Sequence, residues 1–379
     1  MKKLFLLIGV IISLAIGGCT KIEEKPPQKQ LNAEDRADPP DVEEIEMSWK
    51  SLAYEEALTT AQAENKRVIL DFYTDTCSWC KKLDKNTFTD ENVIHFLSEN
   101  FVCLKINSRE GQGIELNKDF SISGHPTIVF LESDGVEIDR ITGYAPPDKF
   151  LSIARDYHAG TNTTADFLKR LEAHPDSLHF YFTLGKKYLE RSAFESASEY
   201  LNKLVASDTE NLSGKKDHAE LLLAEMSYRQ KEYDKGIEKL TEFVRGDRPE
   251  KLLKEGFSYL SRCYEAVEKY EESADTYREA IKRIPENAGL LNGFAWLLAE
   301  QDFALEEALE AAKKANELDP ENTNILDTLA EVYYKCLEYE SAIETIQKAL
   351  KIKPDDSYLK EQLLKFKLAT QDAQPTGDV

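Results

Sequence analysis

Residues 67–83, RVILDFYTDTCSWCKKL, decide the fold of the first domain in this 379-residue chain. The apolar run at 68–70 has too little polar alternation for a surface strand, so it predicts a strand in the middle of a sheet. Cys77 and Cys80 follow where the pattern becomes that of an amphipathic helix. The stretch therefore predicts a buried strand that leads into a helix whose first turn carries two cysteines.

Helix and strand patterns alternate around this stretch, from residue 47 to residue 158. The expected helices are 51–65 and 147–157, and the expected further strands are 101–107, 127–131 and 136–141. A Ser-Asp-Gly turn joins the last two strands as an antiparallel hairpin. The pattern predicts an α/β domain in which helices flank a central mixed sheet.

The spacing of the two cysteines suits disulfide exchange. Backbone N–H groups at a helix N-terminus are unpaired and carry a partial positive charge, which stabilises a thiolate on Cys77. Cys80 lies one turn further along the same face, close enough to attack a mixed disulfide formed at Cys77. Cys77 is thus predicted to be the nucleophile and Cys80 the resolving thiol.

Half of a zinc site and a static disulfide are the alternatives for this pair. A zinc site needs two more ligands, but the sequence has no second Cys-x-x-Cys and its six histidines show no ligand spacing. A disulfide that closes so short a loop adds little stability. We therefore expect a redox-active disulfide between Cys77 and Cys80, with neither a metal nor another cofactor.

Residues 49–157 resemble the thioredoxin superfamily. The segments 71–77, 81–83 and 86–90 look most like the C-terminal thioredoxin-like domain of the transmembrane disulfide reductases of the DsbD type. The resemblance implies a thioredoxin-like fold and thiol-disulfide chemistry. It also gives Asp71 the role of a buried aspartate that helps to deprotonate the resolving cysteine. The alternative for Asp71 is a polar strand end without such a role.

The resemblance further implies a groove for the substrate chain. The segment 124–127, Gly-His-Pro-Thr, looks like the loop that holds a cis-proline opposite the cysteines, where the backbone before the proline is free to pair with a substrate strand. The predicted substrate-binding residues are Trp79, His125, Pro126 and Gly143. An ordinary loop proline and a histidine that merely faces solvent are the alternatives.

The residues around the cysteines depart from the thioredoxin pattern. Thr76 stands where thioredoxins carry tryptophan, and Ser78-Trp79 replaces the Gly-Pro between the cysteines. Because this dipeptide alone does not separate a reductase from an oxidase or an isomerase, redox potential and substrate preference stay open.

Helical repeats follow the α/β domain. Pro285, Pro320 and Pro354 each follow an apolar helix and are spaced 35 and 34 residues apart, the period of tetratricopeptide (TPR) repeats. We expect a linker at 159–177, about five repeats at 178–356, and a capping helix and tail at 357–379. Stacked helix pairs form a concave face, which the TPR resemblance makes a groove for an unidentified protein ligand.

The N-terminus has the pattern of a bacterial lipoprotein precursor. Two lysines precede an apolar run that is too short to span a bilayer comfortably, which predicts a signal peptide at 1–18. Residues 16–19, Ile-Gly-Gly-Cys, resemble a lipobox and imply acylation of Cys19 as a membrane anchor. The Pro-rich polar segment 20–46 would be a flexible tether. A retained helical anchor is the alternative, and Thr20 leaves the choice between inner and outer membrane open.

Charge and the remaining cysteines limit the function further. The formal net charge of −22 would repel phosphate backbones, so nucleic acid is not an expected partner. Cys103 falls in a predicted strand, where a buried thiol is expected and a third redox thiol is the alternative. Cys263 and Cys336 lie two repeats apart and are expected to be inert core thiols.

Together the patterns and the resemblances imply a thiol-disulfide oxidoreductase of the cell envelope, facing the periplasm or the exterior; its resemblance to reductase domains implies that it reduces rather than oxidises. Its expected partners are protein clients, an upstream electron donor and the membrane that holds the lipid anchor, and its repeats would recruit a client or partner. The alternative is a scaffold or assembly protein in which the thioredoxin-like domain only docks.

Overall fold

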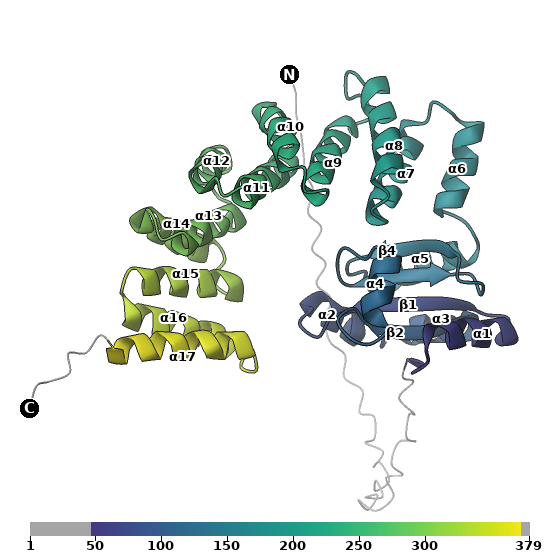
Figure 1. Ribbon diagram of the computed structural model, residues 1–379, viewed down its shortest axis with the longest axis horizontal. Coiled ribbons are helices and arrows are strands. Elements are labelled where there is room, and N and C mark those ends of the chain that lie inside the picture. The colour runs from purple at the N-terminus through teal and green to yellow at the C-terminus, as the bar shows by residue number, and fades with distance from the viewer. Residues whose placement is uncertain (1–46, 373–379) are drawn as a thin grey trace, which may run out of the picture. The chain divides into compact units, whose positions relative to one another are not determined.

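The computed structural model describes residues 47–372 (Figure 1). Its first part is an α/β domain with four strands and five helices. The strands are β1 (Arg67–Tyr73), β2 (Phe101–Asn107), β3 (Thr127–Leu131) and β4 (Glu137–Thr142). The helices are α1 (Tyr54–Glu64), α2 (Ser78–Asn86), α3 (Glu91–Asn100), α4 (Gly113–Asp119) and α5 (Pro147–His158). The predicted fold class is confirmed, and the structure adds α3 and α4, which the pattern did not indicate.

The sheet has the strand order β2-β1-β3-β4. Strand β1 pairs in parallel with β2 and antiparallel with β3, and β3 pairs antiparallel with β4, so the sheet is mixed. Ile69 faces one hydrophobic core and Val68, Leu70 and Phe72 face the other, all fully buried. Burial on both faces explains why β1 lacks the alternation of a surface strand.

The chain changes from strand to helix within a few residues at the end of β1. Cys77 is the N-cap residue of α2, and its side chain accepts a hydrogen bond from the N–H of Cys80. At the other end of α2, the buried Thr87 hydroxyl donates to the carbonyl of Ala145 at 2.7 Å, which fixes the helix against the segment that follows β4. Helix α2 is therefore held at both ends.

In the described residues that follow the α/β domain, every regular element is a helix. Ten of them form five consecutive pairs, and α17 (Ser357–Asp372) packs against the last (Figure 1). The pairs are α7 (Leu178–Glu190) with α8 (Phe194–Ser207), α9 (Lys216–Arg229) with α10 (Tyr233–Arg245), α11 (Glu250–Ala266) with α12 (Tyr270–Arg283), α13 (Ala288–Glu300) with α14 (Leu305–Leu318), and α15 (Thr323–Lys335) with α16 (Tyr339–Ile352). A Cβ on Gly185 would lie 2.6 Å from Leu201, so glycine permits the close approach of α7 and α8.

The range 159–177, which we expected to be a linker, contains helix α6 (Thr164–Ala173). The backbone N–H of Thr164 donates to the carboxylate of Asp139 at 2.8 Å. Asp139 lies on β4, is fully buried, and also binds Lys187 at 2.8 Å and Arg191 at 2.9 Å. The connection between the α/β domain and α7 thus contains a helix whose first residue hydrogen-bonds to the buried carboxylate of Asp139.

No helix between residues 47 and 372 combines the length and the apolar character that crossing a membrane requires. The predicted signal peptide, the lipidated Cys19 and the tether lie outside the described residues.

Candidate active site: a disulfide at a helix N-terminus

Cys77 and Cys80 form a disulfide with an S–S distance of 2.05 Å. Their exposure differs: Cys80 is buried, with 3% of its surface exposed, whereas Cys77 is half-buried. The N–H of Cys80 donates to the Cys77 sulfur at 3.0 Å. A hydrogen bond from an unpaired helix N–H stabilises negative charge on the sulfur that receives it, so the geometry favours a thiolate at Cys77. An incoming disulfide would also reach Cys77 first.

Asp71 lies on β1 and is buried, with only 1% of its surface exposed. Its Oδ1 has no hydrogen-bond partner among the described residues. Burial raises the pKa of Asp71 to about 7; Lys105 opposes this shift and Asp84 adds to it. A carboxyl group with such a pKa can gain or lose a proton near neutral pH.

The strand register brings the predicted groove residues to one edge of the sheet. Phe72 pairs with Thr127, and Thr127 pairs with Thr142. Pro126 and Gly143 therefore lie at the end of β1 that leads to the cysteines. The Gly143 N–H donates to the carbonyl of Pro126 at 2.8 Å, and its φ of +79° is one that glycine adopts without strain.

The His125–Pro126 peptide bond is cis. The backbone N–H and carbonyl of His125 bind no other residue between 47 and 372. The side chain is not simply solvated, because its Nε2 lies 2.7 Å from the Ser108 hydroxyl. Burial, helped by Arg109, lowers the pKa of His125, which favours the neutral form of the ring.

Trp79 lies between the cysteines and exposes 54% of its surface. Its ring centroid is 5.9 Å from that of Tyr144, and the Lys82 ammonium lies 4.9 Å from the Trp79 ring and 4.8 Å from the Tyr144 ring. Sequence reasoning predicted Trp79 but missed Tyr144 and Lys82. Tyr144 could have been found from the sequence, because it is an aromatic residue directly after Gly143, which was predicted to lie in the groove.

The other three thiols of the described residues are unsuited to exchange. Burial raises the pKa of Cys103 to about 12 and that of Cys263 to about 11, and it also raises the pKa of the half-buried Cys336. With these pKa values, Cys103 and Cys263 are almost fully protonated at pH 7 and are poor nucleophiles. Cys103 packs in the core that contains Ile69 and Phe130, as a buried structural thiol would.

Two family models match the chain. Residues 54–158 match the model described as thioredoxin-like domain, and residues 301–364 match the model described as tetratricopeptide repeat. The chain carries a thioredoxin-like domain followed by TPR repeats. The proposed resemblance is therefore confirmed for both parts.

Curated relatives match the thioredoxin-like domain alone. The thiol:disulfide interchange protein DsbD of Actinobacillus pleuropneumoniae is 39% identical over 101 residues, which are 26% of this chain and 17% of that protein. DsbD of Vibrio cholerae is 40% identical over 99 residues, 25% of this chain and 16% of that protein. The chain thus spans about one sixth of the length of these relatives. A solved thioredoxin from Thermus thermophilus is 29% identical, with a TM-score of 0.27, and covers 29% of this chain and 85% of its own.

Proposed function

We propose that the protein reduces disulfides in other proteins through Cys77 and Cys80. The observation that carries this proposal is a disulfide at a helix N-terminus, at the end of β1 where the strand register also places the cis-proline loop. The half-buried sulfur of Cys77 is the one that meets a client, and the buried Cys80 is the one that completes the exchange.

The reaction begins with both cysteines reduced. The Cys77 thiolate attacks one sulfur of a client disulfide, which forms a mixed disulfide and releases the other client sulfur as a thiolate that takes up a proton. Cys80 then loses its proton, attacks the Cys77 sulfur and forms the Cys77–Cys80 disulfide, which releases the second client thiolate. Two electrons pass to the client, and a dithiol donor must return two electrons to the protein.

Asp71 fits the role of proton acceptor for Cys80 in the second step. Its pKa of about 7 means that it is partly ionised at neutral pH, so it can take a proton and give it up again. The unpartnered Oδ1 also fits, because no other residue between 47 and 372 occupies that lone pair. The remaining elements of the proposal are a lipid anchor at Cys19 that holds the protein in the cell envelope, and TPR repeats that recruit the client or the donor.

Reduction, rather than oxidation, is the proposed direction. We expect a potential nearer that of thioredoxin, about −270 mV, than that of the oxidant DsbA, about −120 mV. Equilibration with glutathione, followed by mass spectrometry of peptides that contain Cys77 and Cys80, measures this potential. A value above about −150 mV would reverse the proposed direction.

Insulin reduction by the full chain tests the activity itself. Cys77→Ser should abolish turnover, because it removes the attacking sulfur. The matched control is Cys103→Ser, which changes a buried thiol outside the site and should leave turnover per folded molecule unchanged. Equal turnover in the wild type and Cys77→Ser would contradict the proposal and favour a docking role for the domain.

A further inference from the structure

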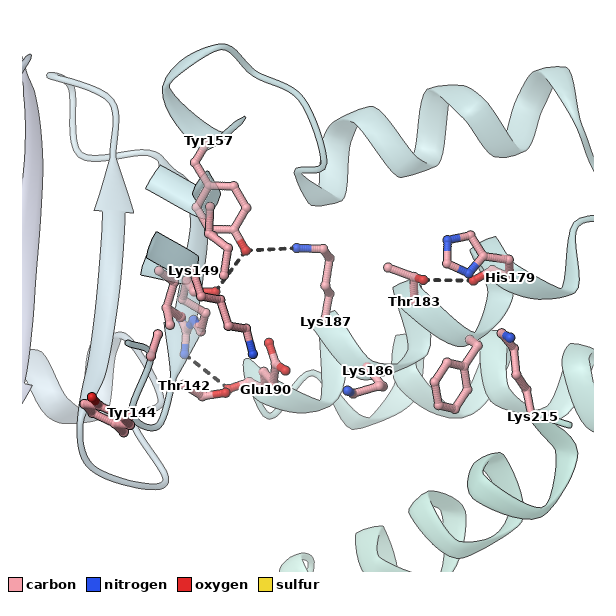
Figure 2. Close-up of a pocket in the computed structure, with 15 residues that line it drawn as sticks. Thr142, Tyr144, Lys149, Tyr157, His179, Thr183, Lys186, Lys187, Glu190 and Lys215 are labelled. Atoms are coloured by element: carbon pink, nitrogen blue, oxygen red, sulfur yellow. Dashed lines mark hydrogen bonds between the residues drawn. The ribbon is translucent and has the colours of Figure 1, made fainter. Parts of the chain in front are cut away.

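A cavity of about 600 Å³ adjoins the redox site (Figure 2). Its walls come from the end of β4, from α5, from α7 and from the residue that precedes α9. Cavities of 300–1,000 Å³ are typical of ligand sites in proteins. The thiol chemistry proposed above makes no use of this cavity, and neither family resemblance assigned any of its lysines a role.

Tyr144 connects the cavity with the cysteines. It lines the cavity, and its ring centroid lies 5.9 Å from that of Trp79. A polypeptide held at Cys77 would pass Tyr144 on its way to the cavity.

Three lysines give the cavity a local positive charge. Lys149 comes from α5, Lys186 from α7, and Lys215 is the N-cap residue of α9. None of the three forms an ion pair with any residue between 47 and 372, and Figure 2 shows Lys149 and Lys186 on opposite walls. In a chain with a net charge of −22, three lysines around one cavity that form no ion pair within residues 47–372 favour an anionic ligand.

The other charges of the cavity do not cancel these lysines. Lys187 is already bound to Asp139 at 2.8 Å, and Arg140 to Glu137 at 2.6 Å. Glu190 is the one carboxylate among the lining residues. Burial raises the pKa of Glu190, and the neighbouring Lys186 and Lys187 oppose that shift. One carboxylate faces several lysines, so positive side chains outnumber negative ones in the lining.

We infer that this cavity binds an acidic segment of the client polypeptide, located a few residues from the cysteine that reacts with Cys77. The inference rests on the proposed function, because a client disulfide at Cys77 brings the neighbouring segment past Tyr144. Carboxylates on that segment would pair with Lys149, Lys186 and Lys215. The cavity would thereby select clients by the charge next to their cysteine, a property that the thiols themselves do not provide.

Peptide binding to the oxidised full chain tests this inference without any redox step. Two labelled, cysteine-free peptides of equal length are compared by fluorescence anisotropy, one with four glutamates and one with four glutamines at the same positions. The triple variant Lys149→Gln, Lys186→Gln, Lys215→Gln should lose about tenfold or more in affinity for the glutamate peptide, since each lost pair contributes roughly a factor of two to three. The affinity of the wild type for the glutamine peptide should be as low as the affinity of the triple variant for the glutamate peptide.

The control is a second triple variant, Lys348→Gln, Lys351→Gln, Lys353→Gln. These lysines are exposed, lie outside the cavity, and give the same change in net charge. The control should bind the glutamate peptide like the wild type. Equal losses in the two triple variants, no preference for the glutamate peptide, or displacement of that peptide by equimolar inorganic phosphate would each overturn the inference.

Steady-state kinetics of disulfide reduction show whether the acidic-segment site or the proposed function itself is wrong. With a disulfide substrate flanked by glutamates, the cavity variant should show a KM raised about tenfold and an unchanged kcat, while reduction of a small neutral disulfide stays unchanged. A wild type that reduces no disulfide would overturn the proposed function. A cavity variant with an unchanged KM in an active protein would overturn only the acidic-segment site.

Discussion

Replacing Asp71 by asparagine should stabilise the thioredoxin-like domain, and the gain should grow with pH. The pKa of Asp71 rises from 3.8 to about 7 on folding because burial disfavours the charged form. The folded state therefore holds a proton that the unfolded state has lost between these two values. The contribution of Asp71 to the free energy of unfolding is greatest below pH 3.8. It falls as the pH rises through this window and stays reduced above about pH 7.

The size of the effect follows from the shift in pKa. A difference of about three units at roughly 1.4 kcal/mol per unit gives a penalty of about 4 kcal/mol at pH 8. At pH 5.5 the same two pKa values give about 2 kcal/mol. The free-energy gain of Asp71→Asn should therefore increase by about 2 kcal/mol between pH 5.5 and pH 8. Any hydrogen-bonding defect of the asparagine amide is the same at both pH values and cancels.

Urea unfolding of the oxidised protein at both pH values measures this difference. Trp296→Phe in every variant removes the one tryptophan of the repeats, so the fluorescence of Trp49 and Trp79 reports on the thioredoxin-like domain. Asp355→Asn is the control, because it removes an exposed carboxylate in the repeats and should give a difference that does not change with pH. A gain from Asp71→Asn that is equal at pH 5.5 and pH 8 would refute the raised pKa.

Three further predictions concern the buried Asp139, the lipid anchor at Cys19 and the resolving thiol Cys80. Asp139→Ala should destabilise the protein by about 3–5 kcal/mol and lower its Tm by roughly 10 °C. The reason is that it leaves two mostly buried cations, Lys187 and Arg191, without their carboxylate. Calorimetry measures this change, with Asp134→Ala as the control. Cys19→Ala should move the protein from the detergent phase to the aqueous phase in phase partitioning, and wild-type protein in the aqueous phase would contradict the anchor. Cys80→Ser should accumulate mixed disulfides between Cys77 and clients, visible on non-reducing gels, because the resolving attack is lost; Cys77→Ser should show none.

Local patterns predicted the parts of the site that depend on adjacent residues. The run 68–70 identified the central strand, and the spacing of Cys77 and Cys80 identified the helix start, because both signals lie within one element. The cis bond before Pro126 followed from the resemblance of a four-residue loop. Each of these features is decided by a few neighbouring residues.

Features that depend on distant residues could not be predicted in this way. The contact of Trp79 with Tyr144 joins residues 65 positions apart, and the cavity lysines come from three separate helical segments. Helix α6 within the expected linker was missed for the same reason, because Asp139 on β4 contacts Thr164, Lys187 and Arg191, which are distant in sequence. Neither periodicity nor spacing records which side chains meet after folding.

The buried charge of Asp139 also determines how the role of the repeats can be tested. Deleting residues 178–369 would remove Lys187 and Arg191 and leave a fully buried carboxylate without its cations, so any loss of trapped clients could reflect misfolding. Deleting 246–352 keeps these cations and the cavity, and joins the end of α10 to the connection before α17.

In this shortened chain α17 can cap α10 as it caps α16 in the intact protein, because stacked repeats present similar faces. In the Cys80→Ser background, we expect the shortened chain to trap fewer or different clients, while reduction of a small disulfide by the same deletion with Cys80 intact stays unchanged. An unchanged set of trapped clients would show that the removed repeats bind another partner. The outcome therefore shows whether client selection depends on the distal repeats or on the part of the chain that the deletion keeps.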